Sequence, residues 1–285
     1  MSSKPSFSLG RAVSAAFASL PAAWGGAWLA LALLWLLGSF GHLVIIQAYS
    51  AGVGVSVHLG LALLFCILLL LVKLAVQGAL YRVAVFGKDA RKEGLGFGGL
   101  QFALPEVRLF ITTIVVVLFI LLIAAAMFIV FAVAFNSSGL MSGHDSTPEA
   151  LKAMLLRHQG ADWVFIGYMI AAWVFLIFVE LKFVLAYVAT IAERRTVTLN
   201  ALGLSSGNVG KLFLGMLLFC LPLIAIFIAI ICHLSGKGVM VDNVNDTARL
   251  IVHAAIQAFA IFVIAPLMVG FLSSAYRQII ETRAR

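Results

Sequence analysis

The stretch LFITTIVVVLFILLIAAAMFIVFAVAF (109–135) contains no charged residue. A helix needs about 20 mainly apolar residues to cross roughly 30 Å of hydrocarbon, and this stretch is long enough. Backbone polar groups in lipid must be hydrogen-bonded within the segment, which predicts a helix. The apolarity is continuous rather than alternating, which excludes a barrel strand. The stretch therefore predicts a transmembrane helix.

Five similar stretches lie on either side of this one. Together they predict six transmembrane helices, at about 23–47, 59–85, 109–135, 163–192, 211–233 and 249–274. The first is longer than the 7–15 apolar residues of a cleaved signal peptide, so we expect it to be retained. Hydrophobic residues make up 64% of the chain and charged residues 11%, against roughly half and a quarter in soluble domains. The prediction is a single all-α polytopic membrane domain over 1–285.

Most Lys and Arg residues fall on one side of the predicted spans. The opposite side carries only four, namely Lys152, Arg157, Lys237 and Arg249. The positive-inside rule therefore predicts that both termini are cytoplasmic. The net charge of +8 is then explained by topology and by contact with anionic lipid headgroups. Nucleic acid is not an expected partner, because the cations are scattered over four short segments.

Interfacial stretches and shared endings suggest an internal repeat. Short segments rich in Gly and Leu precede the odd-numbered spans, at 7–21, 94–110 and 199–213. The first is predicted to be an interfacial amphipathic helix that turns at Pro21 into its span. The even-numbered spans share an ending, in GALYRVA (78–84) and SSAYRQI (274–280), and more loosely in LAYVATIAERR (185–195). The pattern favours three repeats of an interfacial helix and a helical hairpin, with chance similarity as the alternative.

The loop 136–162 contains one further predicted helix. Pro148 follows Ser146 and Thr147, an arrangement typical of a helix start. We expect a short amphipathic helix lying flat on the outer membrane surface. A lid over a cavity is the alternative.

Two charged residues interrupt the predicted spans. Lys73 lies in 59–85, and Glu180 lies in 163–192 with Lys182 two residues later. A charge at the bilayer centre costs a few kcal/mol on insertion scales, so it is retained when paired, hydrated or functional. At 1.5 Å per residue, Lys73 lies about 13 Å from Arg82 along its helix. Its depth is compatible with an ion pair to Glu180, whereas Lys182 is expected to snorkel towards the headgroups.

Polar side chains at helical spacing occur on three of the predicted spans. Residues four, seven or eight apart share a helix face, and polar residues in lipid face the bundle interior. We therefore predict a candidate intramembrane polar site, formed by Lys73, Gln77, Glu180, Tyr187, His253 and Gln257. Two interpretations are open. The residues form structural contacts between helices, or they line a substrate or proton cavity.

Motifs for catalysis, cofactor binding or metal binding are not found. The sequence lacks HExxH, GxSxG and paired carboxylates. Cys66, Cys220 and Cys232 lie in apolar runs without CxxC spacing, which argues against a disulfide or metal site. The glycines of GLGFGGL (94–100) have no Gly-Lys-Ser/Thr after them, so they do not predict a phosphate loop. No enzymatic activity, catalytic residue, cofactor or metal is expected.

The stretch LKFVLAYVATIAERRTVTLNALGLSSGNVGKLFLG (181–215) carries a family resemblance. It resembles uncharacterised six-helix bacterial membrane proteins related to the membrane domain of glycerophosphodiester phosphodiesterases. ERR (193–195), SSGN (205–208) and KLF (211–213) occupy the places of that family's motifs, whereas 209–210 lacks a common Trp. The resemblance implies a six-helix architecture and a bacterial inner-membrane location. The catalytic domain of the fusions is absent, so the resemblance transfers no catalytic residues.

Two functions remain in competition. The first is a non-enzymatic scaffold, assembly or membrane-homeostasis protein, with Lys73 packed against Glu180. The second is a small-solute or lipid transporter with a midplane cavity lined by Lys73, Gln77, Glu180 and His253. Expected partners are membrane lipids, with anionic headgroups on the cytoplasmic side, and proteins that the sequence does not identify.

Overall fold

The computed structural model describes residues 6–50, 55–137, 161–236 and 246–284. Over these residues the regular structure is entirely helical. The apolar runs form α1 (Leu9–Ser50), α2 (Val55–Phe86), α3 (Leu104–Ser137), α5 (Ala161–Ala192), α7 (Val209–Gly236) and α8 (Asp246–Phe259), which continues into α9 (Ala265–Arg283). Six helical segments are long and apolar enough to cross a membrane, which confirms the six predicted spans. The chain is a polytopic membrane protein. The predicted surface helix in 136–162 lies outside the described residues.

Short helices occupy the connections at one end of the long helices. They are η1 (Gly87–Arg91), η2 (Phe97–Gly99) and α6 (Ala201–Ser205). Gly98 and Gly99 both have positive φ, at 59° and 82°, which glycine adopts at no steric cost. A Cβ at Gly99 would lie 2.8 Å from the Cα of Ala27. These glycines therefore allow the connection to pass close to α1.

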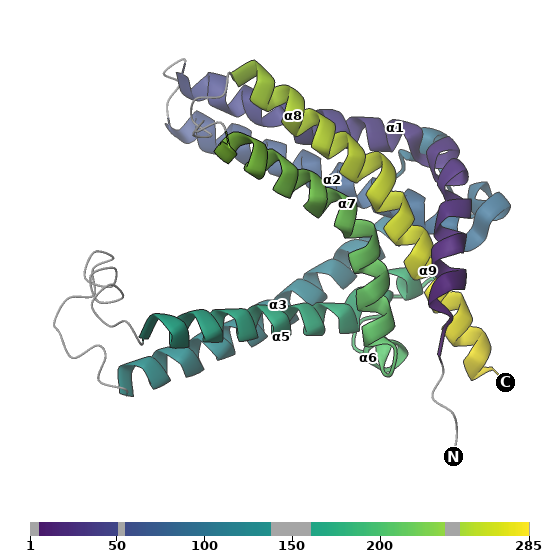
Figure 1. Ribbon diagram of the computed structural model, residues 1–285. Coiled ribbons are helices and arrows are strands. Elements are labelled where there is room, and N and C mark those ends of the chain that lie inside the picture. The colour runs from purple at the N-terminus through teal and green to yellow at the C-terminus, as the bar shows by residue number, and fades with distance from the viewer. Residues whose placement is uncertain (1–5, 51–54, 138–160, 237–245, 285) are drawn as a thin grey trace.

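The predicted separation of an interfacial helix from the first span at Pro21 is wrong. α1 runs without interruption through Pro21 to Ser50. Proline removes one helical hydrogen bond and favours a bend, and the glycines at 25–26 make bending easier. Figure 1 shows α1 changing direction sharply between its first turns and the rest of its length. The turns before Pro21 are thus part of the first long helix, and they bury Ala16 in the packed core.

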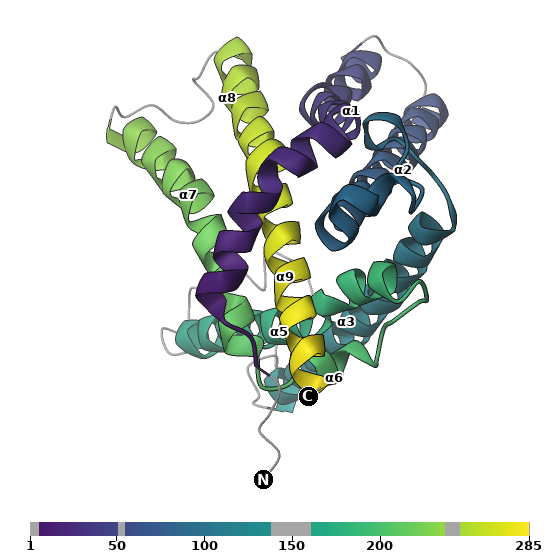
Figure 2. The ribbon, with the colours of Figure 1, turned by 90° about the vertical axis from the view of Figure 1, so that its right-hand side faces the viewer.

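The long helices form two arms that diverge from one packed region (Figure 1). α3 and α5 form one arm, and α1, α2, α7 and α8 form the other. α9 runs through the region where the arms meet, and α1 begins and α9 ends on this side (Figure 2). Side chains on the outer part of α3, such as Leu122 and Phe128, are exposed. Apolar exposure of this kind is expected of helices that face lipid.

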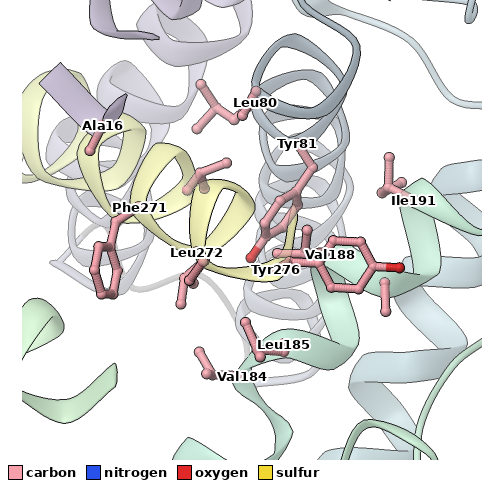
Figure 3. Close-up of a cluster of buried hydrophobic side chains, with 14 of the residues drawn as sticks. Ala16, Leu80, Tyr81, Val184, Leu185, Val188, Ile191, Phe271, Leu272 and Tyr276 are labelled. Carbon is pink, nitrogen blue, oxygen red and sulfur yellow. The ribbon is translucent and has the colours of Figure 1, made fainter. Parts of the chain in front are cut away.

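We call the packed region where the arms meet the junction (Figure 3). The buried side chains labelled in the figure come from α1, α2, α5 and α9, and are Ala16, Leu80, Tyr81, Val184, Leu185, Val188, Ile191, Phe271, Leu272 and Tyr276. Small residues allow close contact between its helices. A Cβ at Gly270 would lie 2.3 Å from the Oγ of Ser19, and a Cβ at Gly215 would lie 2.0 Å from the ring of Phe271.

A proline in the last span supports a contact with α1. The helix widens into a π-helical turn at Ala260–Ile264, directly before Pro266. Pro266 has no N–H to donate to the carbonyl of Phe262, four residues earlier. That carbonyl accepts a hydrogen bond from Nε1 of Trp24 at 2.6 Å. The carbonyl that Pro266 leaves without a helical donor therefore accepts a hydrogen bond from α1.

Candidate functional site

A buried ion pair joins the end of α2 to the start of α3. Nη2 of Arg82 lies 2.8 Å from Oε1 of Glu106 and 3.0 Å from Oε2. The two side chains are 2% and 0% exposed. Buried pairs need further hydrogen bonds to offset desolvation, and Glu106 accepts one from the backbone N–H of Ala103 at 2.9 Å. Glu106 is the third residue of α3, and Ala103 is the residue directly before the helix. A hydrogen bond of this kind caps the N-terminus of a helix, so Glu106 also caps α3.

The ion pair depends on a glycine in α2. A Cβ at Gly78 would lie 2.3 Å from Oε1 of Glu106. The pair also leaves one donor unused, because Nη1 of Arg82 is buried and has no hydrogen-bond partner among the described residues. An unmet buried donor costs about 1–3 kcal/mol.

Two more arginines lie beside Arg82 around a cavity of about 230 Å³. Arg108 comes from the first turns of α3, and Arg194 follows the end of α5. Arg194 has a φ of 53°, in the left-handed region that few non-glycine residues adopt. Its Nη2 lies 2.5 Å from Oε1 of Glu93, and its carbonyl accepts a hydrogen bond from Nη1 of Arg108. The cavity is therefore lined by three cations and one carboxylate.

Buried hydroxyl groups fix the chain after α5. The Oγ1 atoms of Thr112 and Thr190 lie 3.1 Å apart, between α3 and α5. Thr190 also accepts a hydrogen bond from the backbone N–H of Val197 at 3.1 Å. The hydroxyl of Tyr276 donates to Oε1 of Glu193 at 3.1 Å. These contacts tie the segment 193–197 to α3, α5 and α9.

The motif residues of 181–215 make contacts between segments at the same end of the molecule. Glu193 accepts the hydrogen bond from Tyr276. The hydroxyl of Ser205 donates to the carbonyl of Lys182 at 2.9 Å, and Nζ of Lys211 donates to the carbonyl of Phe7 at 2.9 Å. The positions that carry the family resemblance thus have structural contacts in this chain.

The tyrosines of the three proposed repeats all belong to the junction. Tyr81 and Tyr276 are buried, and Tyr187 is half-buried against the same core. Tyr187 has Tyr81 and Glu180 as electrostatic neighbours. The shared endings of the even-numbered spans therefore mark equivalent places in the packing. The repeat itself remains a prediction.

The structure places Lys73 and Glu180 on different arms. Both side chains are exposed. Each precedes a neighbouring junction tyrosine, Tyr81 or Tyr187, by about two helical turns, and α2 and α5 diverge over that distance (Figure 1). Four ion pairs occur among the described residues, and none includes Lys73 or Glu180. The predicted Lys73–Glu180 ion pair is not formed, because the helices separate before they reach these residues.

Glu180 lines a second cavity of about 180 Å³ between α5 and α7. The other lining side chains are apolar or weakly polar, namely Ile177, Leu181, Val184, Phe213, Met216, Leu217 and Cys220. Lys73, Gln77 and His253 do not line this cavity. Lys182 lies elsewhere, with its Nζ 5.4 Å from the ring centroid of Phe178, which is a cation–π contact.

The remaining predicted residues are distributed over other faces. Gln77 is half-buried on α2, and His253 is exposed on α8. α8 packs on α1, where Nε1 of Trp35 donates to the carbonyl of Ala254 at 2.8 Å. Oε1 of Gln257 would lie 3.8 Å from a Cβ at Gly38 of α1. The structure thus brings Glu180 and Tyr187 together, whereas Gln257 contacts α1.

Comparisons with protein-family models, curated proteins and solved structures find no match to this chain. Within the described ranges, no group of three or more His, Cys, Asp and Glu side chains could hold a metal ion. The fold and the site define a class: a helical, multi-pass membrane protein with an apolar packed junction, a buried ion pair near it, and exposed charged residues on two candidate spans.

Proposed function

We propose that this chain is a non-enzymatic membrane protein that assembles with another transmembrane helix through Lys73 and Glu180. This places it in the scaffold or assembly class. We also propose a bacterial inner-membrane location with both termini in the cytoplasm. The distribution of basic residues supports that orientation, and the resemblance of 181–215 supports the location.

The observation that carries the proposal is that Lys73 and Glu180 are exposed and unpaired in the described chain. Each belongs to a helix long and apolar enough to span a membrane. Insertion scales give a cost of about 2.5–3.5 kcal/mol for such a charge at a helix centre. At the junction, by contrast, Arg82 is paired within the chain. A partner helix that carries the opposite charge would offset the cost of placing Lys73 or Glu180 in the membrane.

The chemistry of the partner follows from the two charges. A partner for Lys73 would present Asp or Glu at the same depth, and a partner for Glu180 would present Lys, Arg or protonated His. A second copy of this chain satisfies both conditions. Small residues on the partner helix would allow the close contact that such pairs need.

Photo-crosslinking in intact membranes tests the proposal. A photoreactive amino acid at Leu70, an exposed residue, lies one turn before Lys73, and one at Ile177 lies one turn before Glu180. We expect adducts that are lost from Lys73→Leu and Glu180→Gln, respectively, at normal protein levels. Glu281→Gln, a change at an exposed residue of α9, is the matched control. Unchanged adducts in both variants would reject the proposal.

The cavity beside Glu180 favours transport as a second candidate function. A single carboxylate in an apolar cavity of about 180 Å³ suits a proton or a small cation. Purified protein in liposomes would then carry a proton or cation flux that Glu180→Gln abolishes and Cys220→Ala retains. Flux no higher than in empty liposomes would exclude this candidate.

A further inference from the structure

We propose that the cavity lined by Arg82, Arg108 and Arg194 binds a phosphate group, supplied by an anionic lipid headgroup or by a soluble phosphate compound. The cavity lies where the ends of α2 and α5 meet the start of α3, apart from the intramembrane charges. The proposal is independent of the assembly function proposed above.

Three arginines line the cavity, from the end of α2, the start of α3 and the segment that follows α5. Arginine is the side chain best suited to phosphate, because its planar fork of donors matches the phosphate oxygens and it stays charged. Hydrogen bonds between arginine and phosphate are charge-assisted and frequently bidentate. Convergence of three arginines therefore indicates a multiply charged or multidentate anion.

The carboxylates nearby do not neutralise the cavity. Glu106 pairs with Arg82, and Glu93 pairs with Arg194. Arg108 has no carboxylate partner in the described part of the chain and donates only to the backbone carbonyl of Arg194. One positive charge thus remains without a counter-ion. The positive end of the α3 dipole adds to it, since Leu104 and Pro105 of the first turn line the cavity.

Arg82 supplies an independent indication of a ligand. Its side chain is 2% exposed, and its Nη1 has no hydrogen-bond partner among the described residues. Buried donors in native structures are nearly always paired. Arg82 also lines the cavity, and the carboxylate of Glu106 holds its guanidinium in place.

The surroundings of the cavity suit an amphiphile. Its volume, about 230 Å³, is several times the roughly 30 Å³ of a water molecule in the liquid. Apolar side chains, among them Leu104 and Ile191, form part of the wall. Leu104 is 69% exposed, and nearby Phe102 is 57% exposed. A lipid could place its phosphate among the arginines and its glycerol and first carbons against these side chains.

Lipid binding to the purified full-length protein tests the proposal. Native mass spectrometry in detergent would compare phosphatidic acid with phosphatidylcholine of the same acyl chains. Inorganic phosphate and glycerol 3-phosphate would be added as soluble competitors. The test variant is Arg108→Gln, because Arg108 has no carboxylate pair to break. Arg91→Gln, at an exposed position in η1, is the matched control.

We expect phosphatidic acid to bind more tightly than phosphatidylcholine, and more weakly as salt is raised. Loss of one charge-assisted hydrogen bond in Arg108→Gln should reduce the affinity about tenfold, and Arg91→Gln should leave it unchanged. Competition by soluble phosphate at similar concentrations would support the site and identify a soluble source. If soluble phosphate does not compete and lipid binding is retained, the lipid headgroup is identified as the source of the phosphate.

Two results would overturn the proposal. One is equal affinity for phosphatidic acid and phosphatidylcholine in the unmodified protein. The other is equal affinity of Arg108→Gln and the unmodified protein for phosphatidic acid. If Arg108→Gln does not fold, Arg108→Lys keeps the charge and loses the planar fork. It should then show an affinity below that of the unmodified protein, and full affinity would again contradict the proposal.

Discussion

Glu106 caps α3 with the same carboxylate that pairs with Arg82 on α2. The backbone N–H of Ala103 and the guanidinium both contact Oε2, at 2.9 Å and 3.0 Å. One buried side chain therefore begins a long helix and fixes it to the preceding one. Such a residue couples local helix formation to tertiary packing, so changes to it should affect both.

Glu106→Gln should destabilise the protein by about 3–5 kcal/mol, because it leaves the charge of Arg82 buried and unpaired. The measurement is thermal unfolding in detergent, followed by circular dichroism. The exposed Glu281→Gln serves as a control and should have little effect. Combining Glu106→Gln with Arg82→Met should recover part of the loss, and a larger loss in the double variant would contradict this explanation.

Gly78→Ala should cost about 1–3 kcal/mol, the usual range for overpacking a filled site. Its Cβ would lie 2.3 Å from the carboxylate of Glu106, which is held by Arg82. Gly60→Ala is the matched control on the same helix, since a Cβ there meets nothing within 4 Å. Equal stabilities of the two variants in detergent unfolding would show that the Glu106 carboxylate can move away from the added methyl group at little cost.

Trp24→Phe should cost about 1 kcal/mol through loss of the hydrogen bond to the carbonyl of Phe262. Trp28→Phe is the control, because the Trp28 indole is exposed to a similar degree but packs edge-on to Phe97 and has no hydrogen bond to another described residue. Pro266→Ala adds an N–H that can compete for the same carbonyl. A double-mutant cycle of Trp24→Phe and Pro266→Ala should therefore be non-additive. Additive changes would mean that the proline and the indole act separately.

Thr190→Val should be more destabilising than Thr112→Val. Both remove the contact between the two hydroxyls, but only Thr190 also accepts the backbone N–H of Val197. The unmet N–H should add about 1–3 kcal/mol. Parallel unfolding measurements on the two variants give the comparison directly. A larger effect of Thr112→Val would contradict the assigned bonding.

The spans could be predicted because each is a local property of the sequence. An apolar run such as 109–135 is long enough to cross hydrocarbon, whatever its neighbours are. The continuity of α1 through Pro21 could not be predicted, since proline can bend a helix without ending it. Whether α1 continues depends on its packing against α9, which no local pattern encodes.

The charged contacts were predicted less well than the spans. Depth along a helix made a Lys73–Glu180 pair reasonable, but depth does not show whether two helices run together or diverge. The sequence patterns use Arg82 only as a reference for the depth of Lys73, and they do not single out Glu106. The available signal was LPEVR (104–108), in which an acid follows proline at a helix start. Its partner Arg82 lies 24 residues earlier, and no sequence spacing identifies Arg82 as that partner.

Contacts between the two ends of the chain bear on biosynthesis. The backbone N–H of Ser8 donates to Oε1 of Gln278 at 2.9 Å, across 270 residues. Translation at roughly 5–20 residues per second takes tens of seconds to make that distance. The first turns of α1 therefore leave the ribosome long before their partner on α9 exists. During this interval they must be protected by lipid or by the insertion machinery, and premature termination would leave them without their native contact.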